Sequence, residues 1–449
     1  MNAAPHSAPP GPSTPALVQG YGVYFRTLPF LNECARKYGD FFTLRIPTFP
    51  APITFLSDPE AIKDLYALDG TDSVEAGSIA APLMANVIGE HSMLIIDGAE
   101  HRRHRNLIMP FFMRGQFSKF GDTILKLTER EIDSWPSGAR FPLRTRTRNI
   151  TLKVILSLLF GEERAGSIVA PEVMESFFGR NPSPLVFVRS LQRDLGPLTP
   201  WRYFLRLRAE IYRDIANEVA RRRALGDGAT SDVIGTLISA RDQNGAGLAE
   251  QEILDELLTM VLAGNDTTAT ALAWAVYFIY RDAQVLAALR DEIEAAGTNA
   301  CAERLAALPY LEAAVKEVLR IAPIFPFTLR RLSTAMRVGA RELPAGTYVA
   351  PCIYLVHHRQ DLWKQPERFD PNRFLEARHP AHHYFPFGGG VRHCVGAALA
   401  TYEMKLIVAR MVMRSDFRFD DGYVARTRWI GNFLGPSKDV PVRFRARLA

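Results

Sequence analysis

A single cysteine in a glycine-rich stretch is the clearest sign of chemistry in this sequence. The stretch reads Phe387-Gly-Gly-Gly-Val-Arg-His-Cys394-Val-Gly396. Its glycines allow positive φ angles and close backbone approach, so amide N–H groups can point at the sulfur of Cys394. Apolar residues then repeat at helical spacing over 395–407, which places the cysteine at a helix N-terminus. Both features favour a thiolate that can bind a metal ion.

The spacing of five residues in this stretch points to a particular metal centre. Phe387, Gly390, Arg392, Cys394 and Gly396 fit the haem signature F-x-x-G-x-R-x-C-x-G, although a small buried hydrophobic residue is what most intracellular cysteines are. The stretch resembles the cytochrome P-450 family of haem-thiolate monooxygenases. The resemblance implies that haem b is the cofactor, with Cys394 as the axial iron ligand, and that O₂ is the co-substrate.

A second motif lies upstream, in the largely apolar stretch 253–280. It reads Ala263-Gly-Asn-Asp266-Thr267-Thr. An acidic residue at mid-bilayer costs about 3 kcal/mol, so a helix buried in protein fits better than a membrane span. The motif resembles the family's A-G-x-D-T-T, in which the threonine stabilises the reacting dioxygen and the acid relays protons, here Thr267 and Asp266. A polar patch on the wet side of a helix is the alternative.

A third motif pairs Glu317 with Arg320, which share one face of an apolar helical run. A surface ion pair is the ordinary explanation of this spacing. In the family, the pair joins a second arginine in a buried cluster. The literal string P-E-R-F favours Arg368, but the fuller pattern W-x-x-P-x-x-F-x-P-x-R-F favours Arg373, which we choose.

Haem propionates need cations. His101 and Arg105 are four residues apart and point the same way from one helix, which resembles the family's H-x-x-x-R clamp. The resemblance adds Arg392 and Arg330, with Arg331 as a neighbouring alternative. Phe387 and Gly396 complete the predicted cofactor-binding set.

Other histidines in the sequence give no metal motif. His101 and His104 are three residues apart, but no carboxylate or third histidine follows at a suitable spacing. The pairs His357-His358 and His382-His383 are expected in loops or at the surface. The sequence alone therefore predicts no zinc site.

The pattern of elements agrees with the family fold. Strand-like segments occur in 41–56 and 337–350, and nearly everything between them has helical periodicity. The chain of 449 residues has no Gly/Ser linker in its middle. The resemblance implies a mainly α fold with small β-sheets (α+β), formed by one haem domain over 21–449 after a flexible, proline-rich segment 1–20.

Composition narrows the cellular setting. The four cysteines are far apart and form no CxxC, which fits a reducing compartment, and the N-terminal segment has neither a signal peptide nor an anchor pattern. A soluble, cytoplasmic protein is expected. The net charge is +6, but no basic stripe interleaved with aromatic residues predicts nucleic-acid binding. An acidic ferredoxin or flavodoxin, with its reductase, is the expected electron donor, docking near Arg102, Arg103, Arg114 and Lys119.

The expected substrate is hydrophobic. By resemblance, seven apolar residues line its pocket, and each could equally belong to the core: Met84, Val87, Leu262, Ala263, Ile324, Phe325 and Phe433. Hydroxylation or epoxidation of a lipid, terpenoid or polyketide-like compound of secondary metabolism fits, with 166–200 as a mobile lid. The alternatives are a peroxide-driven or rearranging haem-thiolate enzyme and a non-enzymatic haem sensor.

Overall fold

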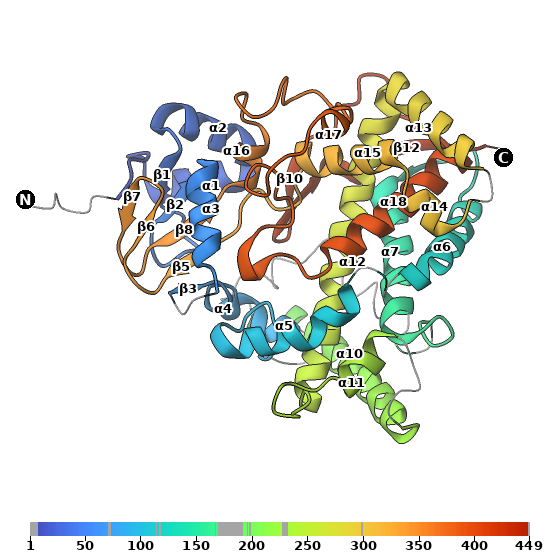
Figure 1. Ribbon diagram of the computed structural model, residues 1–449, viewed down its shortest axis with the longest axis horizontal. Helices are drawn as coiled ribbons and strands as arrows, with labels where there is room; N and C mark the ends of the chain where they lie inside the picture. The colour runs from blue at the N-terminus through green and yellow to red at the C-terminus, as the bar shows by residue number, and fades with distance from the viewer. Residues whose placement is uncertain are drawn as a thin grey trace, which may run out of the picture.

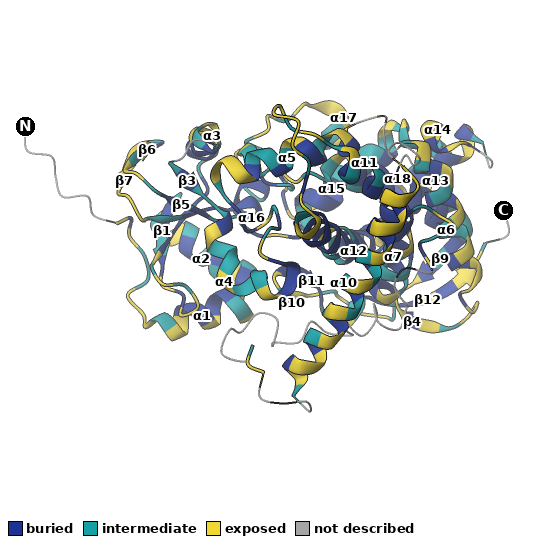
Figure 2. Ribbon diagram, turned by 90° about the horizontal axis from the view of Figure 1, so that it is seen from below, coloured by how far each residue is buried: buried dark blue, intermediate teal, exposed yellow. Residues whose placement is uncertain are grey.

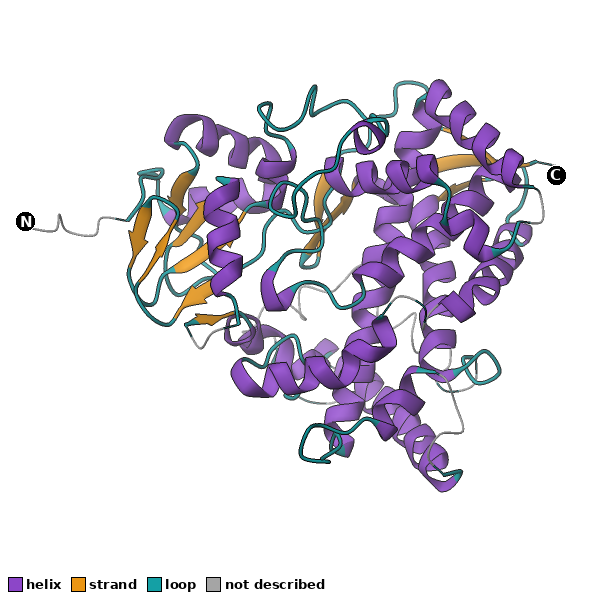
Figure 3. Ribbon diagram, in the orientation of Figure 1, coloured by secondary structure: helices purple, strands orange, loops and turns teal. Residues whose placement is uncertain are grey.

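The computed structural model describes residues 8–70, 73–113, 115, 118–166, 168, 192–194, 196, 199–226, 232–297 and 300–447. Helices make up most of it, and the largest group of strands lies at one end of the molecule (Figure 3). Most of the predicted lid lies outside the described residues, as do Arg114 and residues 1–7.

The helices run from one end of the chain to the other and are labelled as in Figure 1. They are α1 (Ala16–Phe25), α2 (Thr27–Tyr38), α3 (Pro59–Leu68), α4 (Gly77–Ile88), α5 (Gly98–Phe112), α6 (Gly121–Asp133), α7 (Leu143–Phe160), α10 (Pro200–Ala224), α11 (Val233–Ser239), α12 (Glu250–Arg281), α13 (Ala283–Ala296), α14 (Ala302–Ala306), α15 (Pro309–Ile321), α16 (Ile353–His357), α17 (Arg373–Glu376) and α18 (Ala397–Arg414). Short 3₁₀ turns are η1 (Ser118–Phe120), η3 (Gly390–Arg392) and η4 (Ser437–Asp439).

Several helices begin at residues suited to capping. Asp58 accepts a hydrogen bond from the N–H of Glu60 at the start of α3, and Asp282 accepts two at the start of α13. Thr199 precedes Pro200 at the start of α10 and accepts from the N–H of Arg202. Side-chain acceptors and an early proline favour helix starts at these positions, because the first N–H groups of a helix have no partner within it.

The strands form four small sheets. They are β1 (Phe41–Leu44), β2 (Ile53–Leu56), β3 (Val74–Glu75), β4 (Arg140–Pro142), β5 (Arg330–Leu332), β6 (Met336–Val338), β7 (Arg341–Leu343), β8 (Tyr348–Pro351), β9 (Ser415–Arg418), β10 (Thr427–Ile430), β11 (Phe433–Pro436) and β12 (Pro441–Ala446). The largest sheet has the order β1-β2-β8-β5-β3, and the others are β10-β11, β4-β12-β9 and β6-β7. The two predicted strand regions thus meet, because β2 pairs in parallel with β8.

Both faces of the largest sheet are buried. Phe41 packs into one apolar cluster and Phe42 into another, as expected where successive side chains point to opposite faces. The segment 8–20 also packs here: the carbonyl of Pro10 accepts from the N–H of Thr43 at 2.9 Å, and α1 begins at Ala16. Of the segment 1–20, predicted to be flexible, the described residues 8–20 are therefore in contact with the folded domain.

Helix α12 is the axis of the largest apolar core. It packs against α7, α18, α15 and α10, and Figure 2 shows it mostly dark blue in the middle of the molecule. It stays helical through the whole 263–268 motif. No helix of the described residues has both the length and the apolarity needed to cross a bilayer.

Candidate functional site

The cysteine loop connects buried Phe385 to α18. Cys394 is exposed, its N–H donates to the carbonyl of Phe387 at 3.0 Å, and α18 begins three residues later. Gly388 and Gly390 have the positive φ angles expected from the sequence, +71° and +65°. A Cβ added at Gly390 would lie 2.2 Å from Asp69, so this turn needs glycine for space as well as for conformation.

The charge state of Cys394 differs from the expectation. Desolvation by the surrounding protein raises the pKa of the thiol, and the N–H of Gly396 and the guanidinium of Arg105 only partly oppose this. One amide donor is therefore present, the N–H of Gly396 rather than one from Gly388 to Gly390, and the net pKa shift is upward. A coordinating metal ion deprotonates a thiol outright, so the thiolate would come from iron binding rather than from the loop alone.

Cations gather beside the cysteine loop. Arg105, from α5, donates to the carbonyl of His393 at 2.9 Å and has no carboxylate partner among the residues described. His101, one helical turn earlier, is buried, and desolvation together with Arg392 and Arg105 lowers its pKa to about 3. Arg105 is half-buried, and a partly desolvated cation without a paired carboxylate is costly, so a bound carboxylate would relieve that cost.

The other two predicted cations are already paired. Arg330, from β5, contacts Asp69 at 2.8 Å and the carbonyl of Gly389 at 3.1 Å. Arg392 pairs with Asp97 and donates to the carbonyl of Met93 at 2.8 Å. The neighbouring Arg331 is 42% exposed and pairs with Glu75, so Arg330 is the inward-facing member of the two.

Helix α12 carries the second motif. The hydroxyl of Thr267 donates to the carbonyl of Ala263 at 2.6 Å. Ala263 is exposed although Val261 and Asn265, two residues to either side, are buried, so no other described segment covers α12 at this turn. A Cβ added at Gly264 would lie 3.0 Å from Ile155, so this glycine allows close packing of α12 against α7.

Asp266 points toward α7. It lies 3.4 Å from Arg144 and 3.3 Å from Arg148, and Arg144 also contacts Asp439 at 2.8 Å. Its carboxylate is 18% exposed, so it is neither sealed from water nor free in it. Neither arginine was identified from the sequence.

The third motif forms a buried cluster. Arg320 donates to Glu317 at 2.7 and 2.8 Å, and Arg373 donates to the same carboxylate at 3.0 Å. Glu317 and Arg320 are fully buried. Arg368 is exposed and contributes only its backbone carbonyl, which accepts from Arg320 and Arg373. The structure therefore brings Arg373, rather than Arg368, to Glu317.

The predicted pocket residues come from several elements. The rings of Phe325 and Phe433 are 6.3 Å apart, and the carbonyl of Ile324 accepts from the N–H of Leu434 at 2.7 Å. These two segments, far apart in sequence, therefore lie together. Val87 is 2% exposed and packs in the core, whereas Phe325 is 36% exposed. Met84 and Leu262 are half-buried against the same core.

Comparison with known proteins identifies this arrangement. The family model described as Cytochrome P450 matches residues 9–432. The chain belongs to the cytochrome P450 family. It is 33% identical to the putative cytochrome P450 135B1 of Mycobacterium tuberculosis, over 98% of this chain and 91% of that one. It is 31% identical to the putative cytochrome P450 135A1 of the same species, over 90% of this chain and 88% of that one.

Solved structures confirm the predicted fold class. A cyanobacterial CYP120A1 with retinoic acid bound has a TM-score of 0.85 and 23% identity, covering 99% of this chain and all of that one. The cytochrome P450DA haem domain has a TM-score of 0.84 and 20% identity, covering 99% and 98%. At such identities the likeness concerns the fold. Family membership makes the chain a haem-thiolate monooxygenase that uses haem b and O₂.

The residues present fit a haem. The cysteine side chain is exposed in a loop held by Arg105 and Arg330, and Arg105 is half-buried with no carboxylate partner among the described residues. A thiol and a surplus of positive charge match the two chemical needs of haem b, an axial ligand for iron and cations for propionates. The cytochrome P450 therefore contains a suitable donor set.

Some residues near the site gave no signal in the sequence. Asp69 and Asp97 pair with Arg330 and Arg392, and each comes from a distant segment. His357, expected in a loop or at the surface, is fully buried in α16, where its ring accepts from the N–H of Phe385 at 3.0 Å. Of these residues, only His357 could have been recognised from the sequence as buried, because it directly follows the apolar run Ile353–Val356.

Proposed function

We propose that this cytochrome P450 inserts one oxygen atom of O₂ into a hydrophobic organic substrate. The carrying observation is the turn of α12 at Ala263, which no other segment of the described protein covers and which also holds Thr267. The segments assigned to the pocket are apolar, and Phe325 and Phe433 supply aromatic surface. An apolar lining with few polar groups suits a hydrophobic ligand.

We assign the cofactor contacts to residues of four elements. Cys394 would be the axial ligand, and Arg105 and His101 of α5 would bind propionate together with Arg330 and Arg392. Phe387 and Gly396 shape the loop: the carbonyl of Phe387 fixes the N–H of Cys394, and Gly396 offers its own N–H to the sulfur. When bound, haem supplies the oxidation, and electron donation from the thiolate favours O–O cleavage.

Proton delivery falls to the α12 motif. Because the hydroxyl of Thr267 donates to Ala263, its oxygen remains free to accept a further hydrogen bond. Asp266 is held by Arg144 and Arg148 at distances above 3.2 Å, which are loose for charge-assisted hydrogen bonds. We infer that the carboxylate takes up protons from solvent and passes them toward Thr267, which orients them at the reacting oxygen.

Electrons would come from a separate acidic ferredoxin or flavodoxin and its reductase. Of the basic residues assigned to docking, Lys119 is exposed, and Arg102 donates to the carbonyl of Gly70 at 3.1 Å. Arg103 pairs with Asp242 and Glu252, so it offers less free charge to a partner than the sequence suggested. The proposed docking contribution therefore rests mainly on Lys119.

The proposed setting is the cytoplasm, with a product of secondary metabolism. The cysteines Cys34, Cys301, Cys352 and Cys394 are all free thiols, which supports a reducing compartment. A lipid, terpenoid or polyketide-like scaffold matches the apolar pocket residues, and either hydroxylation or epoxidation is compatible with them.

The test is turnover by the haem-loaded protein. Hydrophobic compounds are screened for a spin-state shift of the Soret band, and those that bind are incubated with O₂, NADPH and a surrogate flavodoxin with its reductase. The proposal predicts oxygenated product containing one atom from ¹⁸O₂. Binding without product under these conditions, or product formed only with added peroxide, would contradict it and favour a sensor or a peroxide-driven enzyme.

A further inference from the structure

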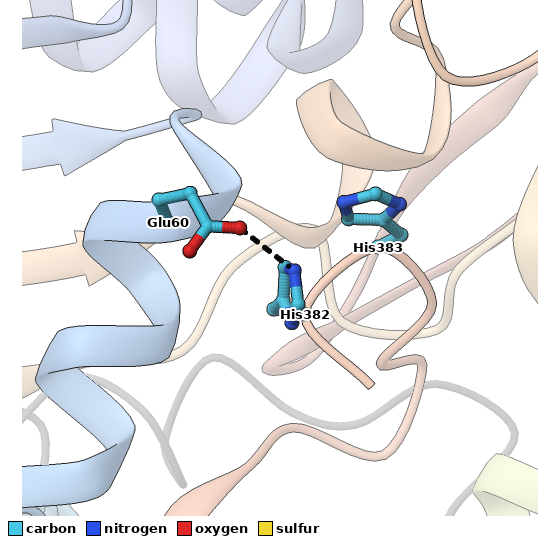
Figure 4. A group of neighbouring side chains, drawn as sticks. All are labelled: Glu60, His382 and His383. Atoms are coloured by element: carbon cyan, nitrogen blue, oxygen red, sulfur yellow. Dashed lines mark ion pairs between the residues drawn. The ribbon is translucent and has the colours of Figure 1, made fainter. Parts of the chain in front are cut away.

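Three metal-binding side chains converge between α3 and the turn that leads into the cysteine loop (Figure 4). They are Glu60 at the start of α3 and the adjacent His382 and His383, and their ligand atoms lie within 4.8 Å of one another. Glu60 Oε1 is 3.1 Å from His382 Nε2. Figure 4 shows the carboxylate and the two imidazole rings around one space between the helix and the turn.

We propose that Glu60, His382 and His383 form a site for a divalent transition-metal ion, best suited to Zn²⁺. Zinc takes imidazole nitrogen and carboxylate oxygen at about 2.0–2.2 Å in tetrahedral geometry, which places ligand atoms about 3.4 Å apart. The distance of 3.1 Å between Glu60 and His382 is already close to this value. Three protein ligands leave the fourth position to water.

The ligand atoms are available to a metal. Lys63 donates to Oε2 of Glu60 at 2.9 Å, which leaves Oε1 on the side of the histidines. The ring nitrogens of His383 make no hydrogen bond to any residue that the structure describes. The backbone N–H of His383 donates to the carbonyl of Pro380 at 2.9 Å, which fixes the turn, and the two rings stand at 83° to each other.

A second cluster of potential metal ligands differs because the nitrogens of its histidine already have hydrogen-bond partners. Glu100, His104 and Glu252 also lie within 4.8 Å of one another. There, both ring nitrogens of His104 are already used, at 2.9 Å from Glu256 and 3.2 Å from Glu252. That cluster is explained by hydrogen bonding alone, whereas the imidazole of His383 has no such explanation.

The position of the site gives it a structural consequence. Two turns along α3 from Glu60, the ring of Tyr66 packs edge-on against Phe385 at 6.0 Å, and Phe385 follows the two histidines by two residues. A metal ion would therefore cross-link α3 to the segment that runs on to Cys394. Binding to the folded state alone raises its stability according to metal concentration, so zinc should raise the melting temperature.

The experiment uses the untagged, haem-loaded, full-length chain after treatment with EDTA and desalting into a buffer that does not bind metals. Zinc binding is measured against a chromophoric chelator, and melting is followed with and without zinc. We expect one zinc ion per chain and a higher melting temperature. His383→Ala and Glu60→Gln should each weaken binding about tenfold or more, which is about 1.4 kcal/mol. Magnesium should not compete, because it prefers oxygen ligands.

Two further variants separate this site from general surface binding. His91→Ala removes a half-exposed histidine that also lies beside a carboxylate, Glu100 at 4.0 Å, but has no second histidine, and it should leave zinc binding unchanged. Lys63→Ala removes a cation from Glu60 and should tighten binding. A normal CO spectrum checks that each variant is folded. Absence of saturable binding, or binding that survives His382→Ala and His383→Ala, would overturn the proposal.

Discussion

Substitutions of Arg373 and Arg368 test whether the buried cluster around Glu317 stabilises the protein. Arg373 donates to Glu317 at 3.0 Å, to the carbonyl of Lys364 at 2.9 Å and to that of Arg368 at 3.1 Å, and it is 8% exposed. The side chain of Arg368 is exposed and has no hydrogen bond or ion pair with any described residue. Arg373→Ala removes a buried partner, and Arg368→Ala is its matched control.

The two substitutions should differ clearly in stability. Breaking a buried ion cluster by removing one partner costs about 3–5 kcal/mol, whereas an exposed side chain without partners contributes within about 0.5 kcal/mol. Unfolding entropy of about 2.1 cal/mol/K per residue gives about 0.9 kcal/mol/K for this chain of 449 residues. Arg373→Ala should therefore lower the melting temperature by about 3–5 °C, and Arg368→Ala by less than about 1 °C.

The assay combines thermal melting with haem content. Glu317 and Arg320 would remain buried without the second arginine, so the segment before the cysteine loop should loosen and Arg373→Ala should also retain less haem. Equal melting temperatures and equal haem content for the two variants would refute the argument. A larger loss in Arg368→Ala would show that the literal P-E-R-F string marks the cluster after all.

Three other outcomes follow from named contacts. Thr267→Ala should shift reducing equivalents from product to hydrogen peroxide while melting changes little, because among the described residues the hydroxyl bonds only to Ala263; unchanged coupling would exclude its role in proton delivery. Asp266→Asn should slow turnover and show a larger solvent isotope effect than the unmodified protein; an equal rate would remove Asp266 from the relay. Burial raises the pKa of Glu218, but hydrogen bonds from Arg221 and Arg222 outweigh it and lower the pKa to about 2. This contribution to the free energy of unfolding, about 3 kcal/mol, is present above about pH 4.5 and is lost as the pH falls toward about 2. The melting temperature of Glu218→Gln should therefore fall less steeply over this pH range than that of the unmodified protein. An equal fall of the melting temperature in the two proteins would contradict the stabilising role of Glu218.

Contiguous motifs made the centre of the site predictable. The cysteine loop, the α12 motif and the Glu317–Arg320 pair each occupy one turn or one helix face, so spacing indicates which side chains are neighbours, and the resemblance to the family supplied the role of each. The choice of Arg373 needed only a longer pattern in the same segment, and the structure brings that residue to Glu317.

Contacts between distant segments could not be foreseen. Asp69 meets Arg330 and Asp97 meets Arg392 only after the sheet and α5 are assembled, and Glu60 meets His382 in the same way. Strands β3 and β4 have two and three residues, too few for alternation to show. The prediction of a lowered pKa for Cys394 was wrong for a related reason. The amide donor could be predicted from the loop sequence, but the desolvation that outweighs it comes from the whole fold.

The identity of the iron ligand is the central claim, and one spectrum tests it most directly. The dithionite-reduced, CO-bound protein should show a Soret band near about 450 nm, which requires a thiolate opposite CO, and Cys394→Ser should lose that band. The exposure of Cys394 and the position of Arg105 beside it predict this result. A band near about 420 nm in the unmodified folded protein, or a band near about 450 nm that survives Cys394→Ser, would contradict the account.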